Sequence, residues 1–231
     1  MSIHKNAKIG KGVSIGSYVV IEEGVIIGDY VTIGHHCIIK SGVVLKDHII
    51  IGDMVILGQR TSSNKKMARK PSKHLGELII EEDTIIGSQV TLYKGSKISE
   101  GVFLADYVSI REQVEVGSHS IIGRQAMIEP NTSIGSYVTI QTGSYITADT
   151  IIEDEVFIGP CCSMSNDKYM ASGKGIHKGP IIRKGAKIGN NATLLPEIEI
   201  GEQAVVGAGA VVTKSIPAQE VFVGNPARKL V

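Results

Sequence analysis

An aliphatic residue recurs at every sixth position along most of this 231-residue chain, and glycine often follows it. The period runs in three stretches, of nine hexapeptides over 9–57, fifteen over 80–164 and six over 182–212. Repeats of this kind stack into a solenoid in which each unit pairs with its neighbours. Three hexapeptides make one triangular turn, so the sequence predicts an all-β parallel β-helix of about ten coils.

A second inward position lies four residues after each aliphatic residue and carries smaller side chains. It is occupied by Val13, Val19, Val25, Val31, Cys37, Val43, Ser120, Ala126, Thr132 and Cys162. Hydrophobic residues reach 42% but aromatic residues only 4%, so Ile, Val and Leu must fill the core. The three cysteines form no CxxC pair, so no disulfide framework or structural zinc site is predicted, and two of them are core fillers.

Glycine is expected at the corners of the prism, where it tolerates a backbone bend that a β-carbon would resist. Two corner columns are mostly glycine, but the third has other side chains at nearly every level. It reads Glu22, Lys40, Gly58, Tyr93, Arg111, Glu129, Thr147, Ser165, Leu195 and Thr213. Repeat proteins often carry ligand sites on insertions and exceptions along one face. We therefore expect ligands along this edge, although simple solvent exposure also explains such residues.

Two phase breaks loop out 17 and 12 residues, and the register places both at this unusual edge. We expect one domain over 1–231, with insertion loops at about 59–76 and 165–181 and a C-terminal tail over 215–231. Met170 and Ile176 would fit the period if the second insertion were an ordinary coil. The segment 171–175, Ala-Ser-Gly-Lys-Gly, lacks a strand pattern and favours a loop.

The charge balance and the chain start exclude some classes of partner. The net charge of +1 gives no overall basic field for nucleic-acid binding. The start of the chain has no apolar signal core, and no stretch approaches the roughly 18 apolar residues of a membrane span. We expect a cytoplasmic protein with no membrane or nucleic-acid partner.

The first insertion is basic. It carries Arg60, Lys65, Lys66, Arg69, Lys70 and Lys73, with no acidic residue between Gln59 and Gly76. Such a loop suits a phosphate-bearing ligand, or is simply solvated. The repeat count places it about five coils, roughly 24 Å, from the second insertion.

The C-terminal third carries the most specific motifs. Residues 165–169 (SNDKY), 179–186 (GPIIRKGA), 207–214 (GAGAVVTK) and 224–228 (GNPAR) resemble those of hexapeptide-repeat acyltransferases, most of all sugar-nucleotide N-acetyltransferases. The resemblance implies left-handed coiling and a homotrimer. It also implies that coenzyme A, as acetyl-CoA, lies outside the C-terminal coils between two subunits.

Carried over by position, the resemblance implies a set of cofactor-binding residues whose small side chains expose backbone amides or whose charges meet phosphates. These are Gly189, Gly207, Ala208, Gly209, Ala210, Lys214, Asn225, Pro226 and Arg228.

Related O-acetyltransferases have a histidine at the start of the second insertion, and this chain has Asn166 there. An alcohol needs a general base, whereas an amine has a nucleophilic neutral fraction near neutral pH. The difference favours acyl transfer to the amino group of a nucleotide-linked amino sugar, with Asn166 or Asp167 orienting the amine. His177 is the rival catalytic candidate, and as a base it would restore transfer to a sugar hydroxyl.

Further residues near the second insertion are candidates for acceptor binding. They are Asp106, Arg111, Glu112, Glu129, Lys168 and Tyr169. Arg111 and Glu129 are 18 residues apart and therefore stacked on the unusual edge, where they could hold a sugar or form an ion-pair ladder.

Two other classes of protein share the predicted fold. A γ-type carbonic anhydrase needs three convergent imidazoles for zinc, and the histidines at 35, 36, 48 and 119 show no such pattern, so no metal is expected. A non-catalytic scaffold remains an alternative, against which the GNPAR tail argues.

Overall fold

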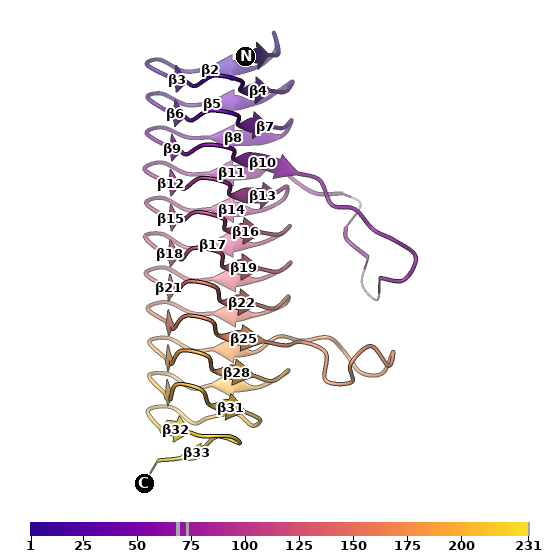
Figure 1. Ribbon diagram of the computed structural model, residues 1–231, viewed down its shortest axis with the longest axis vertical. Coiled ribbons are helices and arrows are strands. Elements are labelled where there is room, and N and C mark those ends of the chain that lie inside the picture. Colours follow the sequence, from indigo (N-terminus) through magenta and orange to yellow (C-terminus); the bar gives the residue numbers. More distant parts are fainter. Residues whose placement is uncertain (68–69, 73, 231) are drawn as a thin grey trace.

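The computed structural model is a three-sided column of stacked strands from which two long loops project (Figure 1). The structure describes residues 1–67, 70–72 and 74–230. Within these ranges every regular element is a β-strand, and the strands of two to four residues form three sheets. From the N-terminus downward in Figure 1 the coils wind in the left-handed sense. The predicted left-handed parallel β-helix is therefore confirmed.

We call the three faces sheets A, B and C in chain order. Sheet A holds β1 (Ser2–Ile3), β4 (Val20–Ile21), β7 (Ile38–Ile39), β10 (Ile56–Gln59), β13 (Thr91–Tyr93), β16 (Ser109–Ile110), β19 (Met127–Ile128), β22 (Tyr145–Ile146), β25 (Ser163–Met164), β28 (Thr193–Leu194) and β31 (Val211–Val212). Sheet B holds β2 (Lys8–Ile9), β5 (Ile26–Ile27), β8 (Val43–Leu45), β11 (Leu78–Ile80), β14 (Lys97–Ile98), β17 (Glu115–Val116), β20 (Ser133–Ile134), β23 (Ile151–Ile152), β26 (Ile181–Ile182) and β29 (Glu199–Ile200).

Sheet C holds β3 (Ser14–Ile15), β6 (Thr32–Ile33), β9 (Ile50–Ile51), β12 (Ile85–Ile86), β15 (Phe103–Leu104), β18 (Ile121–Ile122), β21 (Thr139–Ile140), β24 (Phe157–Ile158), β27 (Lys187–Ile188), β30 (Val205–Val206), β32 (Val221–Val223) and β33 (Arg228–Lys229). Neighbouring strands pair in parallel, for example Ile110 with Ile128, except for the antiparallel pair of β32 and β33. Within the described ranges no helix is long and apolar enough to cross a membrane.

The column is longer than the thirty hexapeptides over 9–212 imply, because it is extended at both ends. Ile3 pairs with Ile21, which adds a strand before the first counted repeat. At the other end β32 pairs in parallel with β30, through Val206 and Phe222. These two residues are 16 apart instead of 18, so the period in the sequence does not reveal this strand. Part of the predicted tail is therefore a continuation of sheet C.

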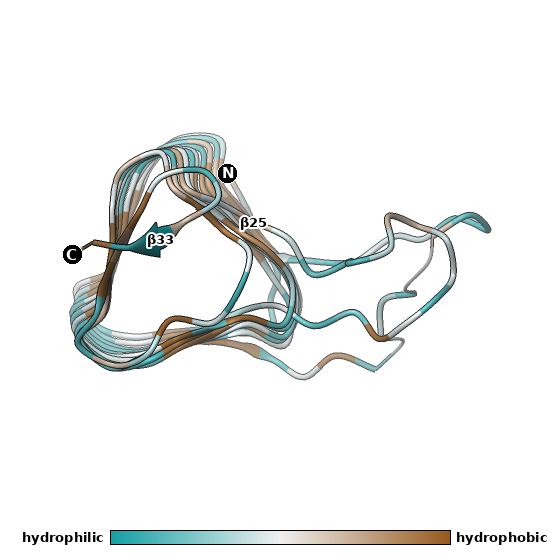
Figure 2. Cartoon of the chain, turned by 90° about the horizontal axis from the view of Figure 1, so that it is seen from below, coloured by the Kyte–Doolittle hydropathy of each residue, from teal (hydrophilic) through white to brown (hydrophobic). Residues whose placement is uncertain are grey.

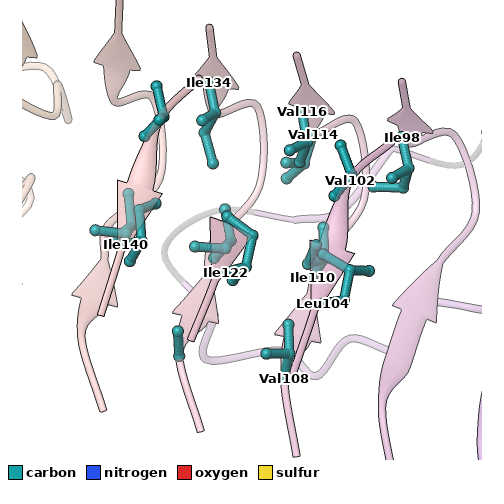
Figure 3. Packing of buried hydrophobic residues seen from close by; sticks show 14 of the residues in the cluster. Ile98, Val102, Leu104, Val108, Ile110, Val114, Val116, Ile122, Ile134 and Ile140 are labelled. Atoms are coloured by element: carbon teal, nitrogen blue, oxygen red, sulfur yellow. The ribbon is translucent and has the colours of Figure 1, made fainter. Parts of the chain in front are cut away.

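The core is the set of aliphatic side chains that point inward from all three sheets. Figure 3 shows Leu104, Ile110 and Ile122 stacked inside the column, and each has no exposed surface. Burying one such side chain contributes about 1.5–3 kcal/mol. The second inward position behaves as predicted, since Cys37 and Cys162 are buried. The buried Ser120 hydroxyl donates to the Gly135 carbonyl oxygen at 2.9 Å.

The corner glycines have a different physical cause from the one predicted. A β-carbon at Gly123 would lie 2.7 Å from the backbone carbon of Gln141 in the next coil. Close approach of successive coils therefore excludes a side chain there. The left-handed backbone sits two residues further along, at Gln125 with a φ of 58°. Non-glycine residues such as Tyr18 and His36 occupy equivalent positions, with φ of 61° and 57°.

Candidate functional site

Both insertions leave the column at the corner between sheets A and B, which we call the A–B edge. The first insertion joins β10 to β11 and spans 60–77, and the second joins β25 to β26 and spans 165–180. Figure 2 shows both loops projecting from the same corner. This is the edge at which the corner glycines are replaced by larger residues, as the hexapeptide register predicts.

A cavity of about 490 Å³ lies on the A–B edge, and we call it the central pocket. Its walls come from the coils after β16, β19 and β22 and from both insertions. The lining residues are Met67, Lys70, Pro71, Ser72, Arg111, Glu112, Gln113, Glu129, Pro130, Asn131, Tyr145, Thr147, Ala148, Asn166 and His177. The structure thus brings five predicted site residues together: Arg111, Glu112, Glu129, Asn166 and His177.

The first insertion reaches the central pocket, which the sequence analysis did not foresee. The repeat count placed its root about five coils from the second insertion, but Figure 1 shows it descending beside the column toward the lower coils. Met67, Lys70, Pro71 and Ser72 therefore form one wall of the pocket. Arg69 and Lys73, the remaining predicted cations in this part of the loop, lie outside the described residues.

Arg111 organises the floor of the pocket. Its Nε and Nη2 atoms donate to the two carboxylate oxygens of Glu112 at 2.9 and 3.3 Å, and the Glu112 side chain is only 3% exposed. The guanidinium also lies 4.8 Å from the centre of the Tyr93 ring. Burial opposes the charge of Arg111, but the hydrogen bonds and charge of Glu112 outweigh it, so the pKa of Arg111 is raised.

Glu129 has a weaker contact with the same cation. Its Oε2 atom lies 3.9 Å from Nη1 of Arg111, and its side chain is 27% exposed. Burial raises the pKa of the Glu129 carboxyl, Arg111 opposes this, and the Glu112 charge adds to it. Burial, with help from the charge of Glu129, also raises the pKa of Tyr145 on the pocket wall. Glu129 is therefore a pocket carboxylate whose charge is only partly compensated.

The second insertion is closed by hydrogen bonds at its base. The backbone N–H of Lys178 donates to the Asn166 carbonyl oxygen at 2.9 Å, which holds the two ends of the loop together. The Asn166 side-chain amide lies 3.5 Å from the carbonyl oxygen of Ala148. Asn166 and His177 are therefore neighbours on the pocket wall although eleven positions separate them in the sequence.

Asp167 lies beside His177 and does not line the pocket. Its carboxylate accepts hydrogen bonds from the backbone N–H groups of Tyr169 and Ala171 at 2.9 and 2.5 Å. The hydrogen bond from Ala171, that from Tyr169 and the nearby His177 lower the pKa of Asp167. Its Oδ2 atom lies 3.8 Å from Nε2 of His177. Asp167 thus shapes the loop and is placed to orient the imidazole.

Three predicted acceptor-binding residues lie outside the central pocket. Asp106 follows the sheet C strand β15, so it stands at the corner between sheets C and A, where it accepts a hydrogen bond from the Ser88 N–H at 2.9 Å. Asp106 and Arg111 follow consecutive strands and therefore lie on different edges of one chain, so an acceptor-binding role for Asp106 stays a prediction. Lys168 pairs with Glu197 at 3.8 Å, and Tyr169 is half exposed on the loop.

The predicted cofactor residues lie on the last coils and are divided between edges. Gly189 and the segment 207–210 lie at the corner between sheets C and A, which we call the C–A edge. Lys214 follows β31 at the A–B edge, and both Lys214 and Arg228 are exposed. A β-carbon at Gly189 would lie 2.8 Å from the Cα of Ala208, so close coil packing alone explains this glycine. Ala210 is fully buried, and Asn225 and Pro226 are exposed and joined by a cis peptide bond.

The histidines weighed as zinc ligands have other contacts. His36 stacks on Tyr18 with ring centroids 4.8 Å apart, and His48 stacks on Tyr30 at 5.3 Å. His35 accepts a hydrogen bond from the Ser17 N–H at 2.9 Å. In the part of the chain that the structure describes, no group of three or more His, Cys, Asp or Glu side chains is placed to hold a metal ion.

A left-handed β-helix with a polar pocket beside an interrupted edge defines a class of hexapeptide-repeat proteins. Two family models of such repeats match parts of the chain. The model for the bacterial transferase hexapeptide (six repeats) matches residues 6–41 and 179–214. The model for the hexapeptide repeat of succinyl-transferase matches residues 113–148.

Similar proteins include acetyltransferases with different acceptors. A dTDP-3-amino-3,6-dideoxy-α-D-galactopyranose 3-N-acetyltransferase of Aneurinibacillus thermoaerophilus is 52% identical over 48 residues, 21% of this chain and 25% of the relative. A serine acetyltransferase of Buchnera aphidicola is 46% identical over 57 residues, 25% of this chain and 22% of the relative. Matches to the first curated relatives span 18% to 39% of their length.

One solved structure matches a larger part of the chain. It is a crystal structure from Bacillus cereus of a protein provisionally assigned as an acetyltransferase, with 30% sequence identity and a TM-score of 0.51. The match covers 64% of this chain and 83% of that protein. Together with the matches to the repeat models, this likeness shows that the chain belongs to the hexapeptide-repeat transferase family.

Proposed function

We propose that this protein transfers an acetyl group from acetyl-CoA to the amino group of a nucleotide-linked amino sugar. The observation that carries the proposal is the central pocket, in which the Glu129 carboxylate faces the same space as Asn166 and His177. A carboxylate with incomplete charge compensation attracts an ammonium group, and an imidazole accepts a proton near neutral pH. The pocket therefore offers both binding and deprotonation of an amine.

The reaction removes two protons from the ammonium group and transfers one acyl group. The bound ammonium releases one proton to solvent, and the neutral amine then attacks the thioester carbonyl carbon to form a C–N bond while His177 takes the second proton from the nitrogen. The C–S bond then breaks, and the coenzyme A thiolate leaves as the thiol with the proton returned by the imidazolium. Asp167, 3.8 Å from His177, stabilises the charged imidazolium. The Asn166 amide is placed to orient the amine.

An amino-sugar acceptor is favoured by the composition of the pocket and by the relatives. Arg111, Asn131 and Ser72 add hydrogen-bonding groups that suit sugar hydroxyls. One relative is named as an N-acetyltransferase of a dTDP-linked 3-amino sugar. Serine acetyltransferases also appear among the relatives, so the relatives alone do not decide between an amine and a hydroxyl acceptor. We favour the amine because of the residues in the pocket.

We propose that coenzyme A contacts the C-terminal coils through Gly207, Ala208 and Gly209, with Lys214 and Arg228 near its phosphates. In one chain the width of sheet A separates the segment 207–210 from the central pocket. In a trimer in which sheet C of one subunit packs on sheet B of the next, the C–A edge of the first lies beside the A–B edge of the second. Each site would then combine two subunits.

Sheet C has the apolar surface that such a homotrimer requires. Sheet C presents exposed apolar side chains at most central levels, and these form a row that Thr139 on β21 interrupts. The row consists of Ile50, Ile85, Phe103, Ile121 and Phe157, which are 39% to 50% exposed. Sheet B presents Ile26 and Ile151, 39% and 44% exposed. We also propose a cytoplasmic location, because acetyl-CoA and sugar nucleotides are used there.

One observation favours a second function, transfer to a sugar hydroxyl. His177 lies in the pocket with Asp167 beside it, and such a pair activates an alcohol as a general base. The two functions differ in the acceptor, not in the cofactor.

The deciding experiment is a thiol-release assay with acetyl-CoA and matched pairs of acceptors. The panel contains dTDP- and UDP-linked 3-amino and 4-amino sugars together with their hydroxyl counterparts. We expect release with an amino sugar and at least 100-fold less with its hydroxyl counterpart. Release with the hydroxyl sugars alone establishes the second function, and release with neither contradicts both.

A further inference from the structure

A second cavity lies on the first insertion, next to the central pocket, and we call it the cationic pocket. It has a volume of about 430 Å³ and a lining of two cations, four hydroxyl groups, a proline and a leucine. These residues are Arg60, Thr61, Ser62, Ser63, Pro71, Ser72, Leu75 and Lys94. The lining contains no carboxylate, so the pocket has a positive field and many hydrogen-bond donors.

The two cations have no acidic partners among the described residues. Nη2 of Arg60 lies 3.4 Å from the Ser41 hydroxyl, a neutral group. Lys94 follows β13 at the A–B edge, half buried, with its ammonium over Gly42. Arg183, by contrast, pairs with Glu153 and Glu199 at 2.8 and 2.7 Å. The unpaired cations in the cationic pocket are therefore available to an anion.

The cationic pocket adjoins the central pocket. Pro71 and Ser72 line both cavities. A third cavity of about 310 Å³ lies between them. It shares Ser62 and Ser63 with the cationic pocket, and Met67 and Arg111 with the central pocket. A single ligand can thus extend along the first insertion from one pocket into the other.

The spacing along the column suits a sugar joined to a diphosphate. Lys94 follows β13 and Glu129 follows β19, which is two strands further along sheet A. Two coil spacings are about 10 Å. A sugar ring whose amine is held at Glu129 therefore directs its glycosidic phosphate toward Lys94. The predicted coenzyme site lies at the opposite end, on the coils of β30 and β31.

We propose that the cationic pocket binds the diphosphate of the nucleotide-linked acceptor, with Arg60 and Lys94 as its phosphate ligands. The inference rests on the proposed function in one respect, that the acceptor amine lies in the central pocket. The two substrates then enter the A–B edge from opposite ends, the acceptor along the first insertion and acetyl-CoA from the C-terminal coils. Coenzyme A also contains a diphosphate, so the test must separate the two sources.

The test is isothermal titration calorimetry of the full chain with UDP, dTDP, inorganic pyrophosphate and coenzyme A as separate probes. We expect a nucleoside diphosphate to bind the wild type, and Arg60→Ala and Lys94→Met each to weaken it about tenfold or more. Lys94→Arg should retain most of the affinity. Lys5→Met is the matched control, because Lys5 is exposed on the same A–B edge, between β1 and β2, and does not line the pocket. Coenzyme A affinity should stay within twofold in all variants.

Unchanged nucleoside diphosphate affinity in both Arg60→Ala and Lys94→Met overturns the proposal, as does the absence of binding to the wild type. Weakened coenzyme A affinity in these variants also overturns it, because the pocket would then belong to the cofactor. Thiol release is measured on the same samples and tests the proposed function separately. If diphosphate binding depends on Lys94 but no acyl transfer is observed, the phosphate site is supported and the proposed reaction is contradicted.

Discussion

The Nε atom of Arg111 donates a hydrogen bond to Oε2 of Glu112 at 2.9 Å, and the Glu112 side chain is almost fully buried. A buried carboxylate is tolerated only while such a partner compensates its charge. The pair therefore fixes the floor of the central pocket and leaves Glu129 as the carboxylate that faces a ligand.

Removal of Arg111 alone should destabilise the protein. Arg111→Ala leaves the buried Glu112 carboxylate without its cation, which costs about 3 kcal/mol. The double variant Arg111→Met/Glu112→Leu should recover most of this loss, because it removes both charges. Thermal denaturation of the three proteins measures the effect, and a single variant as stable as wild type would show that the pair is not needed.

Glu129→Gln should raise the KM for the amino acceptor about tenfold and at the same time raise the melting temperature slightly. Burial raises the pKa of Glu129, so the folded state binds a proton more tightly than the unfolded state. The charged form therefore disfavours folding at neutral pH, and the amide relieves that cost. Steady-state kinetics and thermal shift check the two effects, and loss of both acceptor binding and stability would indicate a structural role instead.

The same carboxylate predicts a pH dependence for acceptor binding. An ammonium binds the ionised form of Glu129, and the raised pKa means that this form is lost at a higher pH than for an ordinary glutamate. Acceptor affinity should thus fall as pH decreases through this raised pKa, with a smaller fall in Glu129→Gln. Calorimetry with the acceptor across this range is the measurement, and identical profiles for the two proteins would exclude Glu129.

His177→Asn should lower kcat by about 100-fold or more with little change in acetyl-CoA affinity, because a general base contributes 10²–10⁴ in rate. Asn166→Ala should lower kcat less, since it removes an orienting group. Thiol-release assays at saturating concentrations of both substrates give kcat. Calorimetry gives the dissociation constant of the coenzyme. Turnover within twofold of wild type in His177→Asn would show that the imidazole is a bystander.

Replacement of residues 61–74 by a short Gly-Ser linker should abolish acceptor binding and leave the β-helix and acetyl-CoA binding intact. The loop supplies Met67, Lys70, Pro71 and Ser72 to the pocket wall, whereas the strands on either side pair with neighbouring coils regardless of the loop. Circular dichroism and calorimetry report the two properties. Normal acceptor binding by this variant would contradict the place given to the first insertion.

Much of the fold follows from the sequence because one period fixes both strand spacing and side-chain direction. The 18-residue interval between Arg111 and Glu129 predicts their stacking, and they are neighbours on the A–B edge. Where the hexapeptide period is interrupted, the sequence does not predict the path of the chain. The first insertion carries no hexapeptide that could indicate its descent to the central pocket. Phe222 is out of phase, so its pairing with Val206 is hidden as well.

The repeat also separates Asp106 from Arg111, because residues that follow consecutive hexapeptide strands belong to different edges. Asp106 shares a coil with Arg111 but follows sheet C, and so stands on another corner. Asn166 and His177 lie close together because the Lys178 N–H donates a backbone hydrogen bond to the Asn166 carbonyl oxygen. No sequence pattern in the loop predicts this hydrogen bond.

The central claim is that the acceptor amine lies in the central pocket, and a crystal structure with coenzyme A and a nucleotide-linked amino sugar tests it most directly. We expect the amine within hydrogen-bond distance of Glu129 and His177, and the diphosphate beside Lys94. A sugar bound outside the A–B edge, with the central pocket empty, would contradict the account.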